Sequence, residues 1–91
     1  MDNEEEPIVV EITDVLDLHT FHPKDVPELL NDYIRECVEK KYVSVRIIHG
    51  KGKGFQKARV EGILKRHPLV ASFQTAPPDA GGWGATIAFL K

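Results

Sequence analysis

A β-branched run gives way to glycines and lysines in the sequence Arg46-Ile-Ile-His49-Gly-Lys-Gly-Lys-Gly54. Such a run predicts a strand, over residues 42–48, that stops at the histidine and continues as a basic loop. The alternating glycines permit positive φ angles and let backbone N–H groups come close to a ligand. Residues 55–67 follow with helical spacing, and Pro68 ends that helix. Backbone donors at a helix start beside lysines form an anion site, whereas the alternative is a flexible connection with solvated lysines.

The most regular element upstream is a helix that starts after Asp25 and closes at Lys40 and Lys41. Asp25 and Glu28 fit a capping box, and lysines suit the C-terminal end of a helix dipole. Its predicted buried face holds apolar residues at helical spacing: Val26, Leu29, Leu30, Tyr33, Ile34, Cys37 and Val38. The buried face predicted for the helix at 55–67 is less regular and comprises Phe55, Ala58, Val60, Ile63 and Leu64.

Further strands are predicted at residues 8–12, 15–18, 70–75 and 85–90, and the first two are either separate or one broken extended segment. The order β-α-β-α-β-β predicts an α/β fold, a two-layer sandwich of two helices on a mixed sheet. Right-handed crossovers make the strands joined by helices parallel, and the last strand is expected to be antiparallel. The carboxyl ends of the parallel strands then share one edge of the sheet, where ligands of open α/β sheets bind.

The chain has 91 residues, a hydrophobic content of 42% and a net charge of −2, which fit one small domain. Residues 1–7 are predicted to be a disordered acidic tail and residues 8–91 the domain. Cys37 is the sole cysteine and is expected to be structural. The lack of a disulfide, of a basic leader and of a membrane-length apolar run predicts a cytoplasmic protein without a membrane partner. Bases gather between residues 51 and 66, which suits a polyanion such as nucleic acid or, equally, a solvated helix face.

Asp17 and His19 alternate with leucines at the end of the 15–18 run. In an extended segment the two side chains share a face, where the carboxylate orients the imidazole and stabilises its charged form. His49 is expected opposite them, beside the lysine-rich loop. Such a set can cleave a phosphodiester, because one histidine activates a nucleophile, the other protonates the leaving oxygen, and lysines with backbone N–H groups hold the phosphate. The alternative is a polar pair that caps the strand end and fixes the loops.

Two other histidines and a tryptophan stand outside this set. His22 could join Asp17 and His19 as a metal ligand, but the pattern is weak, so no metal ligand is predicted and a divalent ion is only one candidate cofactor. His22 is expected instead to shape its loop, and His67 to stand at a helix end. Trp83, which lies among glycines, is expected either to stack on a base or to pack over its own loop.

Three motifs occur in order along the chain: Leu16-Asp-Leu-His19, His49-Gly-Lys-Gly52 and Gly82-Trp-Gly-Ala-Thr-Ile87. In this order and at this spacing they resemble the Smr (small MutS-related) domain family over residues 15–91. The resemblance implies a two-layer sandwich of β-α-β-α-β-β order, similar to the C-terminal domain of a bacterial translation initiation factor. It also implies a domain found at the C-terminus of some MutS-like proteins or alone, and a stand-alone small Smr protein is expected here.

The resemblance further implies nucleic-acid binding and, in many members, nicking or cleavage of DNA or RNA. Links to recombination and repair, and to mRNA cleavage at stalled ribosomes, belong to the same family. Thr20 stands where the first motif usually ends in glycine, so substrate choice and activity itself are in question. Five residues match the first two motifs: Asp17, His19, His49, Gly50 and Gly52.

Two functions from different classes follow. The first is an Smr-type endonuclease on DNA or RNA, with Asp17, His19 and His49 as catalytic residues. The second is a noncatalytic module that binds nucleic acid or the ribosome through the same basic loop. A nucleotide-phosphate binder is less favoured, because the loop lacks the GxxxxGK[ST] pattern. The residues expected to hold phosphate or bases are Gly50, Lys51, Gly52, Lys53, Gly54, Lys57 and Trp83.

Overall fold

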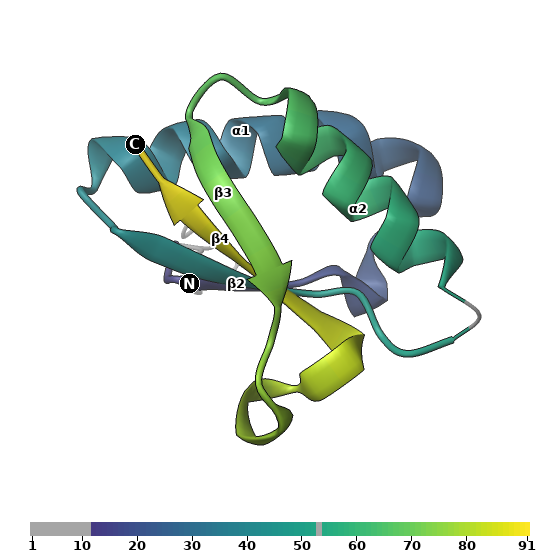
Figure 1. The fold of residues 1–91 in the computed structure, drawn as a ribbon. Helices are drawn as coiled ribbons and strands as arrows, with labels where there is room; N and C mark the ends of the chain where they lie inside the picture. The colour runs from purple at the N-terminus through teal and green to yellow at the C-terminus, as the bar shows by residue number, and fades with distance from the viewer. Residues whose placement is uncertain (1–11, 53) are drawn as a thin grey trace, which may run out of the picture.

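The computed structural model describes residues 12–52 and 54–91, which form two layers (Figure 1). Two helices cover one face of a four-stranded sheet, so the predicted α/β sandwich and its element order are confirmed. The predicted tail at residues 1–7, and all but the last residue of the predicted strand at 8–12, lie outside the described residues. The elements are β1 (Val15–Asp17), α1 (Val26–Glu39), β2 (Ser44–Ile48), α2 (Phe55–Arg66), β3 (Val70–Thr75) and β4 (Ala85–Leu90).

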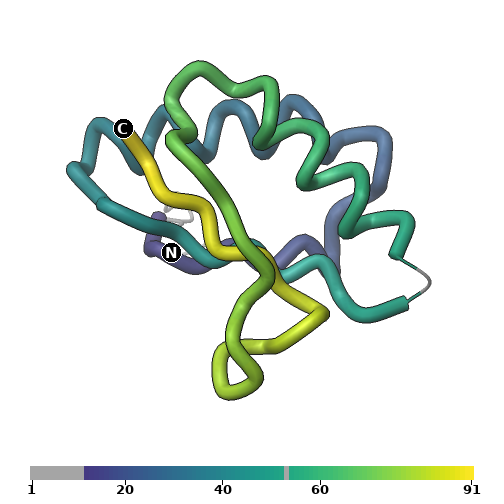
Figure 2. Tube along the Cα trace, in the orientation of Figure 1, coloured from purple at the N-terminus to yellow at the C-terminus, as the bar shows by residue number. Residues whose placement is uncertain are grey.

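The sheet has the strand order β1-β2-β4-β3. β1 pairs with β2 in parallel, and β4 pairs antiparallel with both β2 and β3. β1, β2 and β3 therefore run in one direction, as right-handed crossovers through the two helices require. The last strand inserts between β2 and β3, and the chain that leads into β4 enters from the edge where β1, β2 and β3 end (Figure 2). The predicted shared edge is confirmed.

The core lies between the two helices and the sheet. Val26, Leu30, Ile34 and Cys37 of α1 have no exposed surface and pack with other buried residues such as Ile47 of β2. Their spacing of three to four residues places them on one face of the helix. Cys37 is buried, as predicted, and burial raises the pKa of its thiol. Neither described helix has the length and hydrophobicity that crossing a membrane requires.

Two local predictions about the helices are wrong. Asp25 has the helical backbone angles φ −90° and ψ −10° and no side-chain cap hydrogen bond, so the capping box with Glu28 does not form. A capping side chain needs an extended backbone at its own position, and Asp25 instead ends a 3₁₀ turn over Pro23–Asp25. On α2, Phe55 and Ala58 are exposed, because the first turn of that helix extends past the sheet towards the glycine loop (Figure 1). Only Val60, Ile63 and Leu64 of the predicted face are buried.

Replacing Ile34 by alanine is expected to lower the free energy of unfolding by about 2–5 kcal/mol, because it leaves a cavity in the core between α1 and the sheet. Glu39→Ala is the matched control, since Glu39 is exposed on the same helix, and its effect should stay within about 0.5 kcal/mol. Urea unfolding followed by circular dichroism measures both. Equal losses in the two variants would contradict this assignment of the core.

Candidate functional site

The carboxyl edge of the sheet brings the first two sequence motifs together. Asp17, the last residue of β1, is the Cα partner of Ile48, the last residue of β2. Ile48 in turn pairs with Ala85, the first residue of β4. The loops that leave β1 and β2 and the turn that enters β4 therefore meet at one place, as the sequence predicts.

The glycine loop after β2 packs directly on the turn before β4. The backbone N–H groups of His49 and Gly50 both donate to the carbonyl oxygen of Gly84, at 3.0 and 2.9 Å. A Cβ at Gly84 would lie 3.2 Å from Cγ of Lys51 and 3.4 Å from the carbonyl carbon of Gly50. Glycine at position 84 thus permits the close approach of the two loops.

The glycines of the loop adopt left-handed backbone angles, as predicted. The φ angles are 86° at Gly50, 34° at Gly52 and 87° at Gly54. Gly54 is the N-cap of α2 and supplies no side-chain cap, so the first N–H groups of the helix have no intrahelical acceptor. These donors and the positive end of the helix dipole face the loop, which is the arrangement that binds an anion. Lys53, also expected to hold phosphate, lies outside the described residues.

His49 has both ring nitrogens engaged and is only 9% exposed. Its Nδ1 lies 3.0 Å from the carbonyl oxygen of Gly50, and its Nε2 lies 2.9 Å from Oγ1 of Thr86. A carbonyl oxygen only accepts, so Nδ1 carries a proton. The neutral ring must then accept at Nε2 from the Thr86 hydroxyl, whereas the charged ring donates to that hydroxyl.

A chain of polar side chains continues from Thr86 to α2. The Thr86 hydroxyl lies 3.1 Å from Oε2 of Glu61, in the donating geometry. The same carboxylate oxygen accepts from the ammonium group of Lys57, which also donates to Oγ1 of Thr75 at 2.9 Å. Thr86 has one hydrogen to give, so it bonds to Glu61 when His49 is charged and to His49 when His49 is neutral. The protonation state of His49 therefore decides which of the two groups accepts the Thr86 hydrogen bond.

The pKa of His49 is lowered from its ordinary value. Burial is the main cause, because it penalises the charged ring, and the nearby ammonium of Lys57 adds to it. The hydrogen bond to Gly50 and the carboxylate of Glu61 act in the opposite direction. The neutral ring is consequently favoured at neutral pH.

Asp17 and His19 are both exposed at the same edge, but they do not form a carboxylate–imidazole pair. The Asp17 carboxylate accepts from the backbone N–H of His19 at 2.9 Å and caps a 3₁₀ turn over Leu18–Thr20. The shared face of Asp17 and His19 required the run to stay extended, and that condition is not met, because this cap bends the chain directly after Asp17. By strand alternation Asp17 faces the side of the sheet without helices and His49 faces α2, so the residues share an edge but not a face.

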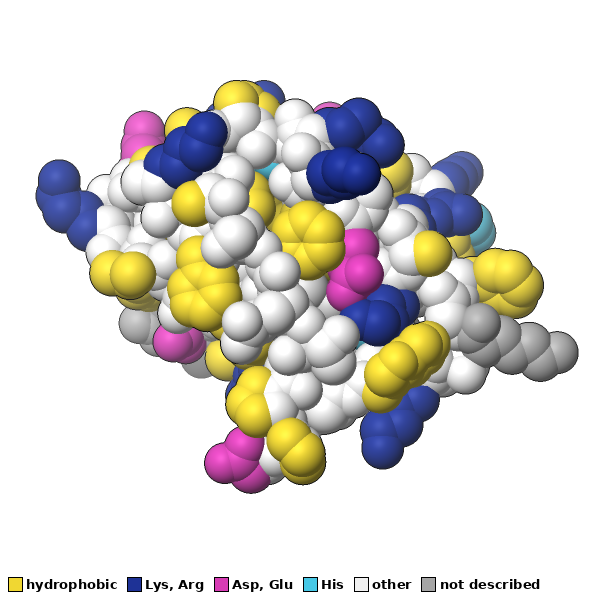
Figure 3. Space-filling view, in the orientation of Figure 1, with side chains coloured by type: hydrophobic (Ala, Val, Ile, Leu, Met, Phe, Trp, Pro, Cys, Tyr) yellow, Lys and Arg dark blue, Asp and Glu magenta, His cyan; other side chains and the backbone are white. Residues whose placement is uncertain are grey.

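Two aromatic rings stand beside the glycine loop. Trp83 is 50% exposed, and the ammonium of Lys57 lies 5.4 Å from its ring centroid. A Cβ at Gly54 would come within 3.0 Å of the Trp83 ring, so the tryptophan packs over the start of α2 rather than over its own turn. Phe55, at the first position of α2, is 78% exposed. Hydrophobic and basic side chains intermingle on the face of the molecule drawn in Figure 3.

The remaining histidines have local roles. Nδ1 of His22 accepts from the backbone N–H of Lys24 at 3.2 Å, so His22 shapes its loop as expected. His67 stands at the C-terminal end of α2, also as expected. Within residues 12–52 and 54–91, no three His, Cys, Asp or Glu side chains lie together as metal ligands would.

Three functional candidates were missed from the sequence: Glu61, Thr86 and exposed Phe55. Glu61 stands four residues after Lys57, a spacing that allows an ion pair on a helix, and this spacing could have indicated that Glu61 belongs to the site. The partnership of Thr86 with His49 had no local sign, because the residues are 37 positions apart.

Comparisons with known proteins agree with these motifs. A family model described as the Smr domain matches residues 16–91. Endonuclease MutS2 of Staphylococcus carnosus is 41% identical over 76 residues, and that of Staphylococcus aureus is 40% identical over 76 residues. Each match covers 84% of this chain but only 10% and 11% of the relatives, so the chain spans about a tenth of their length.

Two solved structures are similar in fold. The Smr domain of Thermus thermophilus MutS2 has a TM-score of 0.81 at 28% identity, covering 87% of this chain and 99% of that one. YdaL, a stand-alone small MutS-related protein from Escherichia coli, has a TM-score of 0.74 at 26% identity, covering 86% of this chain and 64% of that one.

A pH prediction follows from His49. The unfolded chain holds a proton at this position below about pH 6.5, whereas the folded ring resists protonation. The contribution of His49 to stability is therefore present above pH 6.5 and is lost as the pH falls through the lowered folded pKa. Urea unfolding between pH 7.5 and 5 should show a steeper loss of stability in the wild type than in His49→Gln. Parallel pH profiles for the two proteins would contradict the assignment.

Proposed function

The chain belongs to the Smr domain family, and on that premise we propose that it is a nucleic-acid endonuclease acting at the carboxyl edge of its sheet. The proposed reaction is nicking or cleavage of a phosphodiester bond in DNA or RNA. Nucleic acid, free or bound to a ribosome, is the proposed partner in the cytoplasm, and recombination or repair is the proposed setting for a DNA substrate.

The observation that carries the proposal is the meeting of two motifs at one edge. The pairing of Asp17 with Ile48 places the turn that carries His19 beside the start of the glycine loop. An acid–base side chain next to an anion-binding loop is what phosphodiester cleavage needs, because a proton must move while the phosphate is held.

The phosphate is proposed to sit at the glycine loop. The N–H groups at the start of α2, which have no intrahelical acceptor, favour negative charge there, as do the exposed side chain of Lys51 and the lysine at position 53 of the sequence. Lys57 contributes less directly, since its ammonium is bonded to Glu61 and Thr75. Its ammonium also lies over the face of the Trp83 ring, and this cation–π contact helps to hold the ring in place.

His19 and His49 are proposed to have different roles, the first in proton transfer and the second in positioning the loop. His19 is exposed and is not bonded through its ring to any described residue, so it can exchange a proton with a substrate. Asp17 fixes the turn on which His19 stands. His49 can exchange a proton only after one of its two hydrogen bonds opens, so it acts chiefly by holding Gly50 and the loop in place.

Trp83 is proposed to stack on a base of the bound strand. Its ring is half exposed and is held by Gly54 and Lys57, which leaves it pre-positioned for a planar partner. Exposed Phe55 offers a second surface at the same end of α2. Aromatic rings beside a basic loop are typical of proteins that bind unpaired nucleotides.

The alternative is a noncatalytic binding module that uses the same loop. The engagement of both ring nitrogens of His49 favours it, as does Thr20 in place of the usual glycine. Binding needs only the basic loop and the aromatic rings, whereas cleavage also needs a free acid–base group.

His19→Ala is expected to reduce cleavage by about 10²–10⁴-fold while leaving binding nearly unchanged, because it removes a proton-transfer group. His22→Ala is the matched control, since that histidine is also exposed and lies three residues away. Supercoiled plasmid and a long single-stranded RNA, each with and without EDTA, serve as substrates. EDTA sensitivity would indicate a divalent ion. No cleavage above the His19→Ala trace, with salt-sensitive binding intact, would support the binding module instead.

Trp83→Ala is expected to weaken binding of a single-stranded oligonucleotide by about 1–3 kcal/mol, the usual loss of one stacked base. Trp83→Phe should recover part of it. Val43→Ala is the control, because Val43 is an exposed apolar residue, 76% accessible, at the other end of β2. Fluorescence anisotropy at fixed salt measures the three variants. Wild-type affinity in Trp83→Ala would rule out stacking on this ring.

A further inference from the structure

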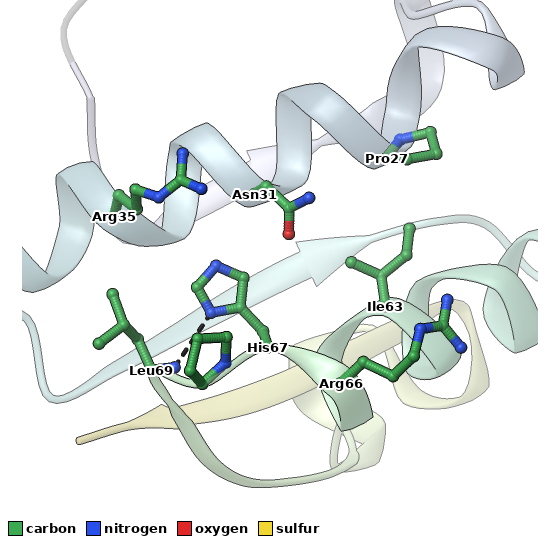
Figure 4. A pocket seen from close by; sticks show the side chains of 8 residues that line it. Pro27, Asn31, Arg35, Ile63, Arg66, His67 and Leu69 are labelled. Carbon is green, nitrogen blue, oxygen red and sulfur yellow. Dashed lines mark hydrogen bonds between the residues drawn. The ribbon is translucent and has the colours of Figure 1, made fainter.

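A cleft of about 350 Å³ opens between α1 and α2, away from the glycine loop. Its polar lining residues come from both helices and from the turn after α2 (Figure 4). They are Asn31, Arg35, Arg66 and His67. No acidic residue lines the cleft among the described residues. The proposed nuclease site makes no use of this part of the molecule.

His67 is the fixed group of the cleft. The residue is only 7% exposed, and its ring stands between the helices and points towards α1 (Figure 4). Its Nδ1 accepts from the backbone N–H of Leu69 at 3.1 Å. A nitrogen that accepts carries no proton, so the ring proton lies on Nε2. His67 therefore presents a donor to the cleft, and no described residue accepts from it.

The neighbouring charged groups add donors but no acceptors. Arg35 and Arg66 are exposed at the cleft, and guanidinium groups only donate. Arg35 is bonded to Asp32 at 3.1 Å on the helix surface, which offsets part of its charge. Arg66 makes no ion pair with a described residue. The C-terminal end of α2 carries a partial negative charge, and Lys65 and Arg66 in its last turn counter it.

We propose that this cleft is a second binding site, specific for a phosphate-type oxyanion held by Nε2–H of His67 and the guanidinium of Arg66. A buried donor without an acceptor costs free energy unless a ligand or water pairs with it. Arg66 lines the same cleft, and its exposed guanidinium lies back along α2, 3.7 Å from where a Cβ of Gly62 would stand, so it reaches the anion by turning towards His67. A planar guanidinium matches two oxygens of a phosphate. The anion is either a free phosphate compound or a backbone phosphate of nucleic acid. The glycine loop and this cleft lie at opposite ends of α2, which spans about 18 Å. If the anion belongs to a nucleic acid, the two sites would therefore contact different phosphates of one strand.

The test is a titration of the whole chain with inorganic phosphate, followed by NMR of the His67 ring and the Leu69 amide. Saturable shifts of both signals are expected. Arg66→Gln should weaken the affinity by about tenfold, the loss typical of a charge-assisted hydrogen bond. Lys65→Gln removes the same charge from the same turn without lining the cleft, so it should leave the affinity almost unchanged. No saturable shift, or equal weakening in the two variants, would overturn the proposal.

A second arm identifies the source of the anion. A short oligonucleotide that shifts the His67 signals at lower concentration than phosphate indicates a nucleic-acid backbone contact. Shifts with phosphate but not with the oligonucleotide indicate a small free anion, and both results support the site. Because no cleavage is measured, failure here is independent of failure of the proposed nuclease.

Discussion

The carbonyl oxygen of Gly84 accepts two backbone hydrogen bonds, and the functional edge depends on them. They tie His49 and Gly50, at the end of β2, to the turn that leads into β4. The tie limits the positions open to the loop, whose glycines could otherwise adopt many conformations, and the bond of the His49 ring to Gly50 adds to it. β4 is held between β2 and β3 by its pairing with both strands, and the contact at Gly84 extends the pairing with β2 into the loop. One oxygen atom thus links the order of the sheet to the geometry of the anion-binding loop.

The polar chain from His49 to α2 is the second constraint. Burying polar groups is unfavourable unless each finds a partner, and here each has one: His49 bonds to Gly50 and Thr86, Thr86 gives its one hydrogen to His49 or to Glu61, and Glu61 accepts from Lys57. Lys57 bonds to Thr75 of β3 and Glu61 lies next to Thr86 of β4, and these two contacts orient α2 over the sheet. The helix start, whose first N–H groups have no intrahelical acceptor, thereby faces the loop. A buried polar network of this kind contributes more to specificity of arrangement than to net stability.

Residue patterns were enough to predict the element order, the shared edge and the left-handed glycines. These depend on local chemistry: β-branched runs, helical spacing and glycine positions. The burial of His49 was also readable in principle, since it alternates with Val45 and Ile47, but its partners were not. The sheet order brings Thr86 to His49, and the rotation of α2 brings Glu61 to Thr86. Both are tertiary properties, which local patterns do not show. The capping box failed for a similar reason, because Asp25 belongs to a 3₁₀ turn that the helix pattern does not reveal.

α2 is attached to the sheet in two different ways along its length. From Val60 onward it buries Val60, Ile63 and Leu64, whereas its beginning is held by polar contacts such as Lys57 with Thr75. Apolar burial is insensitive to small shifts, but hydrogen bonds are lost when a helix moves by about 1 Å. The loop end of α2 is therefore the end that a bound anion or a charged His49 can displace. Binding sites are commonly built on such weakly held ends of helices and strands. The glycine loop, which lies next to the polar end of α2, agrees with this general placement.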